Sequence, residues 1–158
     1  MAENDKRKRI LNAASEIISE KGLKDSTITE IAKKASVVDS IIYHYFKNKE
    51  DLLFCALNAH INSSIAAINF QLQGIIGAAP KLGKMLWVHL HSNDYNQGNE
   101  RIVKRLLLEC RANKNFYTHK SYNSLKEYAG VLTGLLKEGV AEGAFRSDLN
   151  IAVAAGND

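Results

Sequence analysis

The stretch that decides the fold is Thr27 to Leu53, TITEIAKKASVVDSIIYHYFKNKEDLL. Thr27 is followed three residues later by Glu30, the spacing of a capping box, in which a hydroxyl and a carboxylate satisfy the free amides at a helix start. We therefore expect a helix to begin at Thr27. Apolar residues then recur at helical spacing and predict one packed face: Ile28, Ile31, Ala32 and Ala35.

A turn at Ser36 and Val37 and a second helix from Asp39 to Phe46 are expected next. This helix would place Ile42, Tyr45 and Phe46 inward and leave four side chains outward: Ser40, Ile41, Tyr43 and His44. An outward isoleucine and tyrosine gain nothing in water, whereas a DNA major groove offers thymine methyls, sugars and phosphates. With a third helix opening at Asn48, the pattern predicts a DNA-binding helix-turn-helix, the alternative being an ordinary helical hairpin.

Three segments resemble the TetR family of bacterial transcriptional regulators: IIYHYFKNKEDLL (residues 41–53), TITEIAKKASV (residues 27–37) and EKG (residues 20–22). The resemblance covers the first third of the chain. The sequence departs from the usual family pattern in the turn, with Ser36 in place of Gly. It also has Val38 where Ser commonly caps the recognition helix, and Ser40-Ile41 in place of Gly-Thr. The base sequence read by the helix therefore does not carry over from the family.

The resemblance implies a dimeric repressor whose two recognition helices enter successive major grooves of a palindromic operator, roughly 34 Å apart. Phosphate contacts would set the register, Lys49 being the contact that matches the family: Thr27, Thr29, Tyr43 and Lys49. Base reading would fall to the start and outward face of the recognition helix: Asp39, Ser40, Ile41 and His44. Asp39 has an alternative role as favourable negative charge at a helix start.

Bulk composition predicts an all-α protein, because the chain of 158 residues has a single Pro and its apolar residues recur at helical spacing. Net charge does not discriminate between functions, since the first 50 residues hold ten basic and eight acidic residues and the remainder eleven and nine. The cluster from Lys6 to Arg9 is what would meet phosphate; its alternative is a solvated helix start.

The chain is expected to form two modules joined within one long helix. A first helix over residues 5–21, stopped by Gly22, would brace a DNA-binding domain of residues 1–50. Asn48 would cap a helix reaching to near Gln73, and residues 51–158 would form a helical effector-binding and dimerisation domain. Its further helices are expected over residues 81–91, 99–112 and 116–142, with a polar loop at 92–98 and Gly143 as the last stop.

Residues 144–158 read as the approach to one more helix that stops early. Members of the resembled family usually dimerise through two further helices at this position. We therefore expect the domain to be incomplete at its C-terminus, the alternative being that subunits meet through other surfaces.

Sites between the helices of a bundle are concave and mostly apolar, so the later helices are candidates to enclose an effector. The resemblance implies a small and often lipophilic one. Each candidate lining residue has ordinary core packing as its alternative: Trp87, His91, Tyr95, Cys110, Phe116, Tyr117 and Tyr122.

The sequence contains no GxSxG, HExxH or GxxxxGK[ST] motif, and it predicts neither an enzyme nor a cofactor. His89 and His91 would point about 200° apart on a helix, so no metal site is predicted there, while convergence of His60, His119 and Cys110 stays open. Cys55 and Cys110 have no CxxC spacing, which is typical of core thiols in a reducing compartment, with a redox pair as the alternative.

No stretch approaches the roughly 18 consecutive apolar residues of a membrane span, and the charged N-terminus does not lead into a signal-peptide apolar run. A cytoplasmic regulator with no membrane contact is therefore expected. The alternative functions are a helical protein-interaction scaffold, which would show no salt-dependent binding to duplex DNA, and a helical enzyme, which would need polar groups converging in the cavity.

Overall fold

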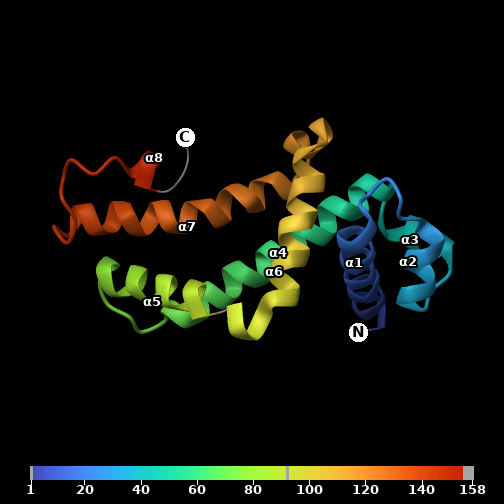
Figure 1. The fold of residues 1–158 in the computed structure, drawn as a ribbon, viewed down its shortest axis with the longest axis horizontal. Helices are drawn as coiled ribbons and strands as arrows, with labels where there is room; N and C mark the ends of the chain where they lie inside the picture. Colours follow the sequence, from blue (N-terminus) through green and yellow to red (C-terminus); the bar gives the residue numbers. More distant parts are fainter. Residues whose placement is uncertain (1, 92, 155–158) are drawn as a thin grey trace. The chain divides into compact units, whose positions relative to one another are not determined.

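The computed structural model describes the backbone of residues 2–91 and 93–154, and the side chains of residues 3–88 and 99–154. Every regular element in these ranges is a helix, which confirms the predicted all-α class (Figure 1). In chain order the elements are α1 (Ala2–Lys21), α2 (Ile28–Ala35), α3 (Asp39–Tyr45), α4 (Lys49–Leu72), α5 (Ala78–His91), α6 (Asn93–Arg111), the 3-10 helix η1 (Lys114–Thr118), α7 (Ser121–Ala141) and α8 (Ile151–Ala154).

The helices pack into two compact units, and α4, α6 and α7 each contribute to both. The first unit comprises Met1–His60 and Gln97–Tyr122, so the later part of α6 and all of η1 pack with the helix-turn-helix. The second comprises Ile61–Asn96 and Asn123–Asp158. The boundary expected near residue 50 divides the DNA-binding domain from the effector-binding domain by function, not by packing, and it stays a prediction.

The first unit has a continuous apolar core. Its buried side chains come from α1, α2, α3 and its C-cap, the first half of α4, and α6. They include Ile10, Ile18, Ile31, Ile42, Phe46, Leu53, Leu57, Leu106 and Cys110. From η1, Phe116 is also fully buried and lies 5.3 Å from the ring of Phe54 on α4. Sustained burial of large apolar side chains is the dominant stabilising contribution in such a unit, so the helix-turn-helix rests on a rigid base.

By length and composition alone, α4 is long and apolar enough to cross a membrane, with a mean hydropathy of 1.2 in its best window. Its first half, however, supplies a nearly unbroken run of buried residues to the first unit, from Leu52 to Leu57. A helix that is apolar on all sides is commonly a buried one. Core packing therefore accounts for the apolar character of this part of α4.

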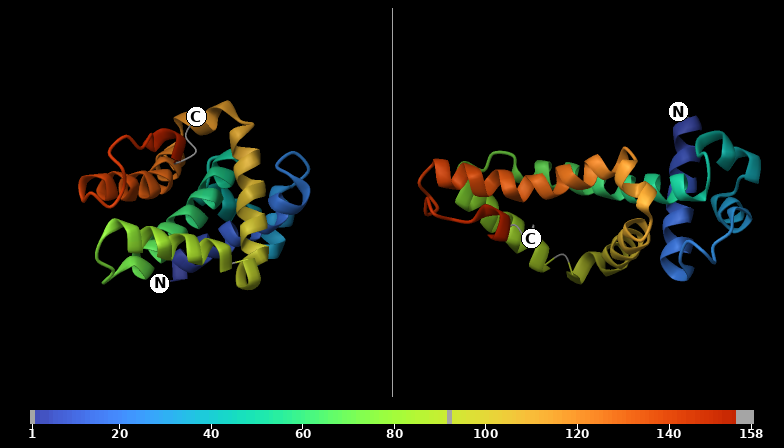
Figure 2. Two further views of the ribbon diagram at one scale, coloured as in Figure 1. Left: turned by 60° about the vertical axis from the view of Figure 1, so that its left-hand side comes forward. Right: turned by 90° about the horizontal axis from the view of Figure 1, so that it is seen from above.

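In the second unit, α5 and α7 lie beside the second half of α4 (Figures 1 and 2). The Glu142 carboxylate, just beyond α7, accepts a hydrogen bond of 3.0 Å from the Ala78 amide at the start of α5. Lys81 on α5 forms a 2.6 Å ion pair with Glu138 on α7. Leu135 and Leu136 of α7 are buried, so one face of α7 and a pair of polar contacts join these helices.

The predicted polar loop over residues 92–98 is wrong, because α6 already begins at Asn93; residue 92 lies outside the described residues. Polarity suggested a loop there, but extending a helix by a turn costs little once its apolar stripe has formed.

The predicted single helix over residues 116–142 is wrong at its start. Residues 114–118 form η1, whose first amides are capped by the Asn113 side chain, which accepts from the Asn115 amide at 2.9 Å. The following α-helix, α7, begins only at Ser121, and Gly143 ends it in a left-handed conformation as expected.

Candidate functional site

The predicted capping box at the start of α2 is confirmed. Thr27 Oγ1 accepts from the Glu30 amide at 3.2 Å, and the Glu30 carboxylate accepts from the Thr27 amide at 3.1 Å. Glu30 also forms an ion pair with Lys21 at the end of α1. The hydrogen bond from Lys21, followed by those from Thr27, lowers the pKa of Glu30. The start of α2 is therefore fixed both locally and against α1.

The turn between α2 and α3 is built on Ser36, which adopts φ 56° and ψ 48° at the C-cap of α2. Its amide and that of Val37 donate to the last carbonyls of α2, at Lys33 and Ala32. A left-handed residue other than glycine carries a steric cost of about 1–2 kcal/mol. This is the position where the sequence departs from the family's usual glycine, and the fold tolerates the serine.

The recognition helix α3 presents the expected face. Ile42 and Phe46, at 1% and 2% relative exposure, anchor it in the core, whereas Tyr43 is 58% exposed. Ser40 and His44 are also exposed and Ile41 is half-buried. The helix is thus held by its buried residues and offers a contiguous outer surface of polar, aromatic and aliphatic groups.

Besides Thr27, three of the predicted DNA contacts have hydrogen-bond partners within the protein. Thr29 Oγ1 donates to Asp39 Oδ2 at 2.6 Å, which ties the first turn of α2 to the first turn of α3. Lys49 Nζ donates to the carbonyl oxygens of Ser26 at 2.8 Å and Lys24 at 3.3 Å. Lys49 therefore also holds the loop before α2 against the start of α4.

The basic cluster at residues 6–9 divides into two pairs. Arg7 lies over the Phe46 ring, 5.5 Å from its centroid, and Arg9 donates to the Ala35 carbonyl at 2.9 Å. Both arginines thus brace α1 against the helix-turn-helix. Lys6 and Lys8 are exposed, and they are the members of the cluster that solvent and ligands can reach.

A polar cluster adjoins the turn between α3 and α4, and it is formed by Asp51 and Cys55 on α4 and by His119 between η1 and α7. Asp51 Oδ1 is 3.1 Å from His119 Nε2 and 3.6 Å from Cys55 Sγ, and Oδ2 accepts from the Lys47 amide at 2.9 Å. One carboxylate oxygen of Asp51, the Cys55 sulfur and one ring nitrogen of His119, all atoms of kinds that bind metals, lie within 4.8 Å of one another.

Burial opposes ionisation of Asp51, but hydrogen bonds from the Lys47 amide, His119 and Cys55 outweigh it and lower the pKa of Asp51. Burial, followed by the negative charge of Asp51, raises the pKa of the Cys55 thiol. Asp51 is therefore the charged member of the cluster and Cys55 a thiol that donates to it. Burial likewise raises the pKa of Cys110 to about 12, which fits the expected core thiols.

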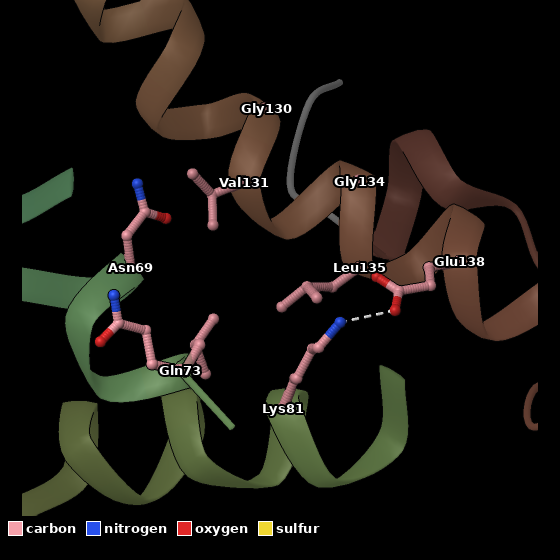
Figure 3. A pocket seen from close by; sticks show the side chains of 9 residues that line it. Asn69, Gln73, Lys81, Gly130, Val131, Gly134, Leu135 and Glu138 are labelled. Atoms are coloured by element: carbon pink, nitrogen blue, oxygen red, sulfur yellow. Dashed lines mark hydrogen bonds and ion pairs between the residues drawn. The ribbon is translucent and has the colours of Figure 1, made fainter. Parts of the chain in front are cut away.

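The second unit contains a cavity of about 460 Å³ between α4, α5 and α7 (Figure 3). Its wall is made of small, aliphatic and amide side chains with one ion pair: Asn69, Leu72, Gln73, Lys81, Gly130, Val131, Gly134, Leu135 and Glu138. Gly130 and Gly134 lie one turn apart on α7, and a Cβ added at either would meet no atom within 4 Å. The absence of two side chains on one face of α7 thus leaves this space open.

The five predicted effector residues whose side chains are described do not line this cavity. Phe116, Tyr117 and Tyr122 form a ring cluster in the first unit, with centroid separations of 5.2–5.8 Å. Cys110 is fully buried, and Trp87 is 55% exposed with Lys84 over its ring. The side chains of His91 and Tyr95 lie outside the described residues.

The sequence analysis predicted neither the residues of the cavity wall nor the contact between Asp51 and His119. The cavity wall had a readable signal, since two glycines four residues apart inside a predicted helix leave the same face of that helix without side chains. The Asp51–His119 contact had none, because 68 residues separate the partners and His119 was expected inside a continuous helix.

Two family models match the sequence, and the first of them covers the helix-turn-helix with its outward-facing α3. The model for "Bacterial regulatory proteins, tetR family" matches residues 10–55, and the model for "YsiA-like protein, C-terminal region" matches residues 57–156.

Similar proteins support the same assignment. The fatty acid metabolism regulator protein of Bacillus subtilis is 33% identical over 148 residues, which cover 92% of this chain and 74% of that protein. The crystal structure of the regulator FadR from Bacillus subtilis in complex with stearoyl-CoA superposes with a TM-score of 0.78 at 32% identity, over 93% of this chain and 77% of that one. FadR from Bacillus halodurans gives a TM-score of 0.78 at 28% identity, over 95% and 76%. The chain therefore belongs to the TetR family of bacterial regulatory proteins and is a ligand-responsive, DNA-binding transcriptional regulator.

Proposed function

We propose that the protein is a cytoplasmic repressor that binds a palindromic operator as a homodimer and leaves it when a long-chain acyl-CoA binds. The observation that carries DNA binding is the exposed face of α3, mounted on the buried Ile42 and Phe46. An outward Ile41 beside an outward Tyr43 suits a groove with thymine methyls and phosphates better than it suits water.

Within this proposal, phosphate contacts by Thr27, Thr29, Tyr43 and Lys49 set the register, and Lys6 and Lys8 add charge from α1. Base reading belongs to Ser40, Ile41 and His44. One carboxylate oxygen of Asp39 accepts the hydrogen bond from Thr29. The other oxygen is the one we assign to a cytosine amino group.

The proposed effector follows from the cavity and from the stearoyl-CoA complex of the similar Bacillus subtilis regulator. A volume of about 460 Å³ falls within the usual range for small-molecule sites, about 300–1,000 Å³. Leu72, Val131 and Leu135 offer an aliphatic wall to an acyl chain, while Asn69 and Gln73 offer carboxamides to polar atoms. The bound effector would shift the helices that surround the cavity, and a coupling of about 1–3 kcal/mol would weaken operator binding 5- to 150-fold.

The test starts with duplexes selected by the purified protein from a random pool, which supply the operator. Fluorescence anisotropy then measures operator affinity at several salt concentrations, with and without stearoyl-CoA and with free CoA as the control. We expect steep salt dependence and release by stearoyl-CoA only. The absence of salt-dependent binding to any duplex favours the alternative of a protein-interaction scaffold. Release by free CoA as well contradicts an acyl-chain site.

A matched pair of variants locates the effector. Gly134→Leu fills the cavity from α7 and should abolish release while preserving operator affinity. Gly83→Leu places the same side chain in open space on α5, away from the cavity wall, and should respond like wild type. Both changes replace an interior helical glycine, so the gain in helix propensity is common to both. Equal release of the two variants by stearoyl-CoA would remove this cavity from the proposal.

A further inference from the structure

A continuous chain of hydrogen bonds in the first unit joins the turn after the recognition helix to the start of α7. The Lys47 amide donates to Asp51 Oδ2 at 2.9 Å, and Asp51 Oδ1 is 3.1 Å from His119 Nε2. The other ring nitrogen of His119, Nδ1, accepts from the Ser121 amide at 3.2 Å. Two backbone amides 74 positions apart in the sequence are thus connected through only two side chains.

The Ser121 amide fixes how His119 can act. A backbone N–H only donates, so Nδ1 must present its lone pair, and the neutral ring then carries its proton on Nε2. That proton faces the Asp51 carboxylate, so both ring nitrogens are used and the ring orientation is set.

The same pattern argues against a metal ion at Asp51, Cys55 and His119, despite their close approach. A histidine that binds a metal through one nitrogen almost always donates its other N–H to an acceptor. Here the other nitrogen faces a donor, the Ser121 amide. The hydrogen-bonded form therefore fits the surroundings of His119, and the metal-bound form does not.

The pair is shielded from solvent. The side chains of His119 and Asp51 are 21% and 20% exposed, and the His119 ring lies 5.2 Å from the Phe54 ring. Charge-assisted hydrogen bonds are stronger in such partly desolvated positions than on the surface, where most ion pairs contribute little. A second contact runs parallel to it, from Asn115 on η1 to the Glu50 carboxylate at 3.2 Å.

The two ends of this series of hydrogen bonds, the Lys47 and Ser121 amides, lie next to different parts of the molecule. Lys47 directly follows Phe46, the C-cap of α3, so the position of its amide sets how the recognition helix leaves the core. Ser121 is the first residue of α7, and the same helix supplies the cavity residues from Gly130 to Glu138. A rotation or displacement of the first turn of α7 changes the geometry at His119, and thereby at Asp51 and Lys47.

We propose that His119 is a positioning residue for DNA binding: it holds the α3–α4 turn, through Asp51, in the geometry that reads the operator, and it passes movement of α7 to that turn. The second half of this statement rests on the proposed effector site; the first half does not.

The experiment compares three substitutions. In His119→Asn, the side-chain oxygen takes the place of Nδ1 and still accepts from Ser121, but the side chain no longer reaches Asp51. In His119→Gln, the amide nitrogen takes the place of Nε2 and can still donate to Asp51. His60→Asn is the matched control, because His60 on α4 hydrogen-bonds Ser15 on α1 at 3.0 Å and also Asn99 on α6, and neither of these partners belongs to α7.

Two measurements need no effector: hydrogen exchange at the Lys47 amide, and operator affinity, each with urea unfolding to show that the variant is folded. For His119→Asn we expect faster exchange at Lys47 and operator binding weakened roughly fivefold to tenfold. His119→Gln and His60→Asn should stay within about twofold of wild type. Wild-type exchange and affinity in His119→Asn, or equal losses in His60→Asn, would overturn the positioning role.

The third measurement is the ratio of operator affinities without and with stearoyl-CoA, which should move towards one in His119→Asn. If stearoyl-CoA fails to release wild type, the proposed effector is wrong while the exchange and affinity results still decide the role of His119. A full response to stearoyl-CoA in His119→Asn would refute the transmission of movement from α7. Saturable Zn²⁺ binding that is lost in Cys55→Ser and kept in Cys110→Ser would make the cluster a metal site and overturn the proposal as a whole.

Discussion

The neighbouring residues Ile41 and Ile42 allow a sharp test of how α3 is mounted, because the same substitution should have opposite kinds of effect at the two positions. Ile42 is 1% exposed and Ile41 is half-buried on the outer face. Replacement by alanine removes three carbons from each side chain. At Ile42 the lost transfer free energy is about 2.4 kcal/mol, at about 0.8 kcal/mol per buried carbon, and the remaining cavity brings the expected loss to about 2–5 kcal/mol.

At Ile41 the expected loss in the free energy of unfolding is smaller, about 1 kcal/mol, because a half-buried side chain gives up only about half of this transfer free energy and leaves no enclosed cavity. Urea unfolding separates the two outcomes: with a slope of about 2 kcal/mol/M, Ile42→Ala should lower the midpoint by about 1–2.5 M. Selection from random duplexes should show a changed base preference for Ile41→Ala, by about 1–3 kcal/mol at the position that Ile41 contacts. Equal destabilisation by both variants, or an unchanged preference for Ile41→Ala, would refute the assigned orientation of α3.

Three further outcomes are expected. Lys49→Ala should flatten the slope of log affinity against log salt by about 0.9 if Lys49 contacts a phosphate; weaker operator binding with an unchanged slope would mean that its bonds to the Ser26 and Lys24 carbonyls are its whole role. Ser36→Gly should stabilise the fold by about 0.5–1 kcal/mol, since relief of the left-handed strain exceeds the added chain entropy of glycine, and the midpoint temperature of thermal unfolding should rise by about 1–4 °C. Asp51 has a lowered pKa, so its ionised carboxylate stabilises the fold above the usual Asp pKa of about 4, and this contribution is lost as pH falls below that value. Asp51→Asn should therefore destabilise the chain at pH 7 and much less at pH 3 in urea unfolding, and equal losses at both pH values would contradict an ionised Asp51 in the folded state.

The helix-turn-helix was predictable because its determinants are local. The capping box at Thr27 and Glu30 and the Asn48 cap, which accepts from the Asp51 amide at 2.8 Å, are interactions between residues three apart. The inward face of α3 followed from helical periodicity, and Ile42 and Phe46 are buried as expected. Tyr45 was expected inward with them and is half-buried, with its hydroxyl donating to the Glu3 carbonyl.

Local signals were weaker where helix ends depend on neighbours. The break before α7 arises because Phe116 is drawn into the core against Phe54 and because His119 caps the Ser121 amide. Neither partner is visible from a periodicity that runs smoothly through residues 116–142. The polar stretch from Asn93 gave the opposite error, since a loop was expected where the helix continues.

The sequence by itself determined the helices of the DNA-binding part, the outward face of α3 and the family, because caps, turns and periodic apolar faces are set by residues within a few positions of one another. Only the tertiary structure decided where the second unit leaves a cavity and how the start of α7 is connected to the turn after α3. The cavity depends on the side chains that Gly130 and Gly134 lack as well as on the residues that line it. A contact such as Asp51 with His119 depends on how α4 and η1 pack, which no local pattern encodes.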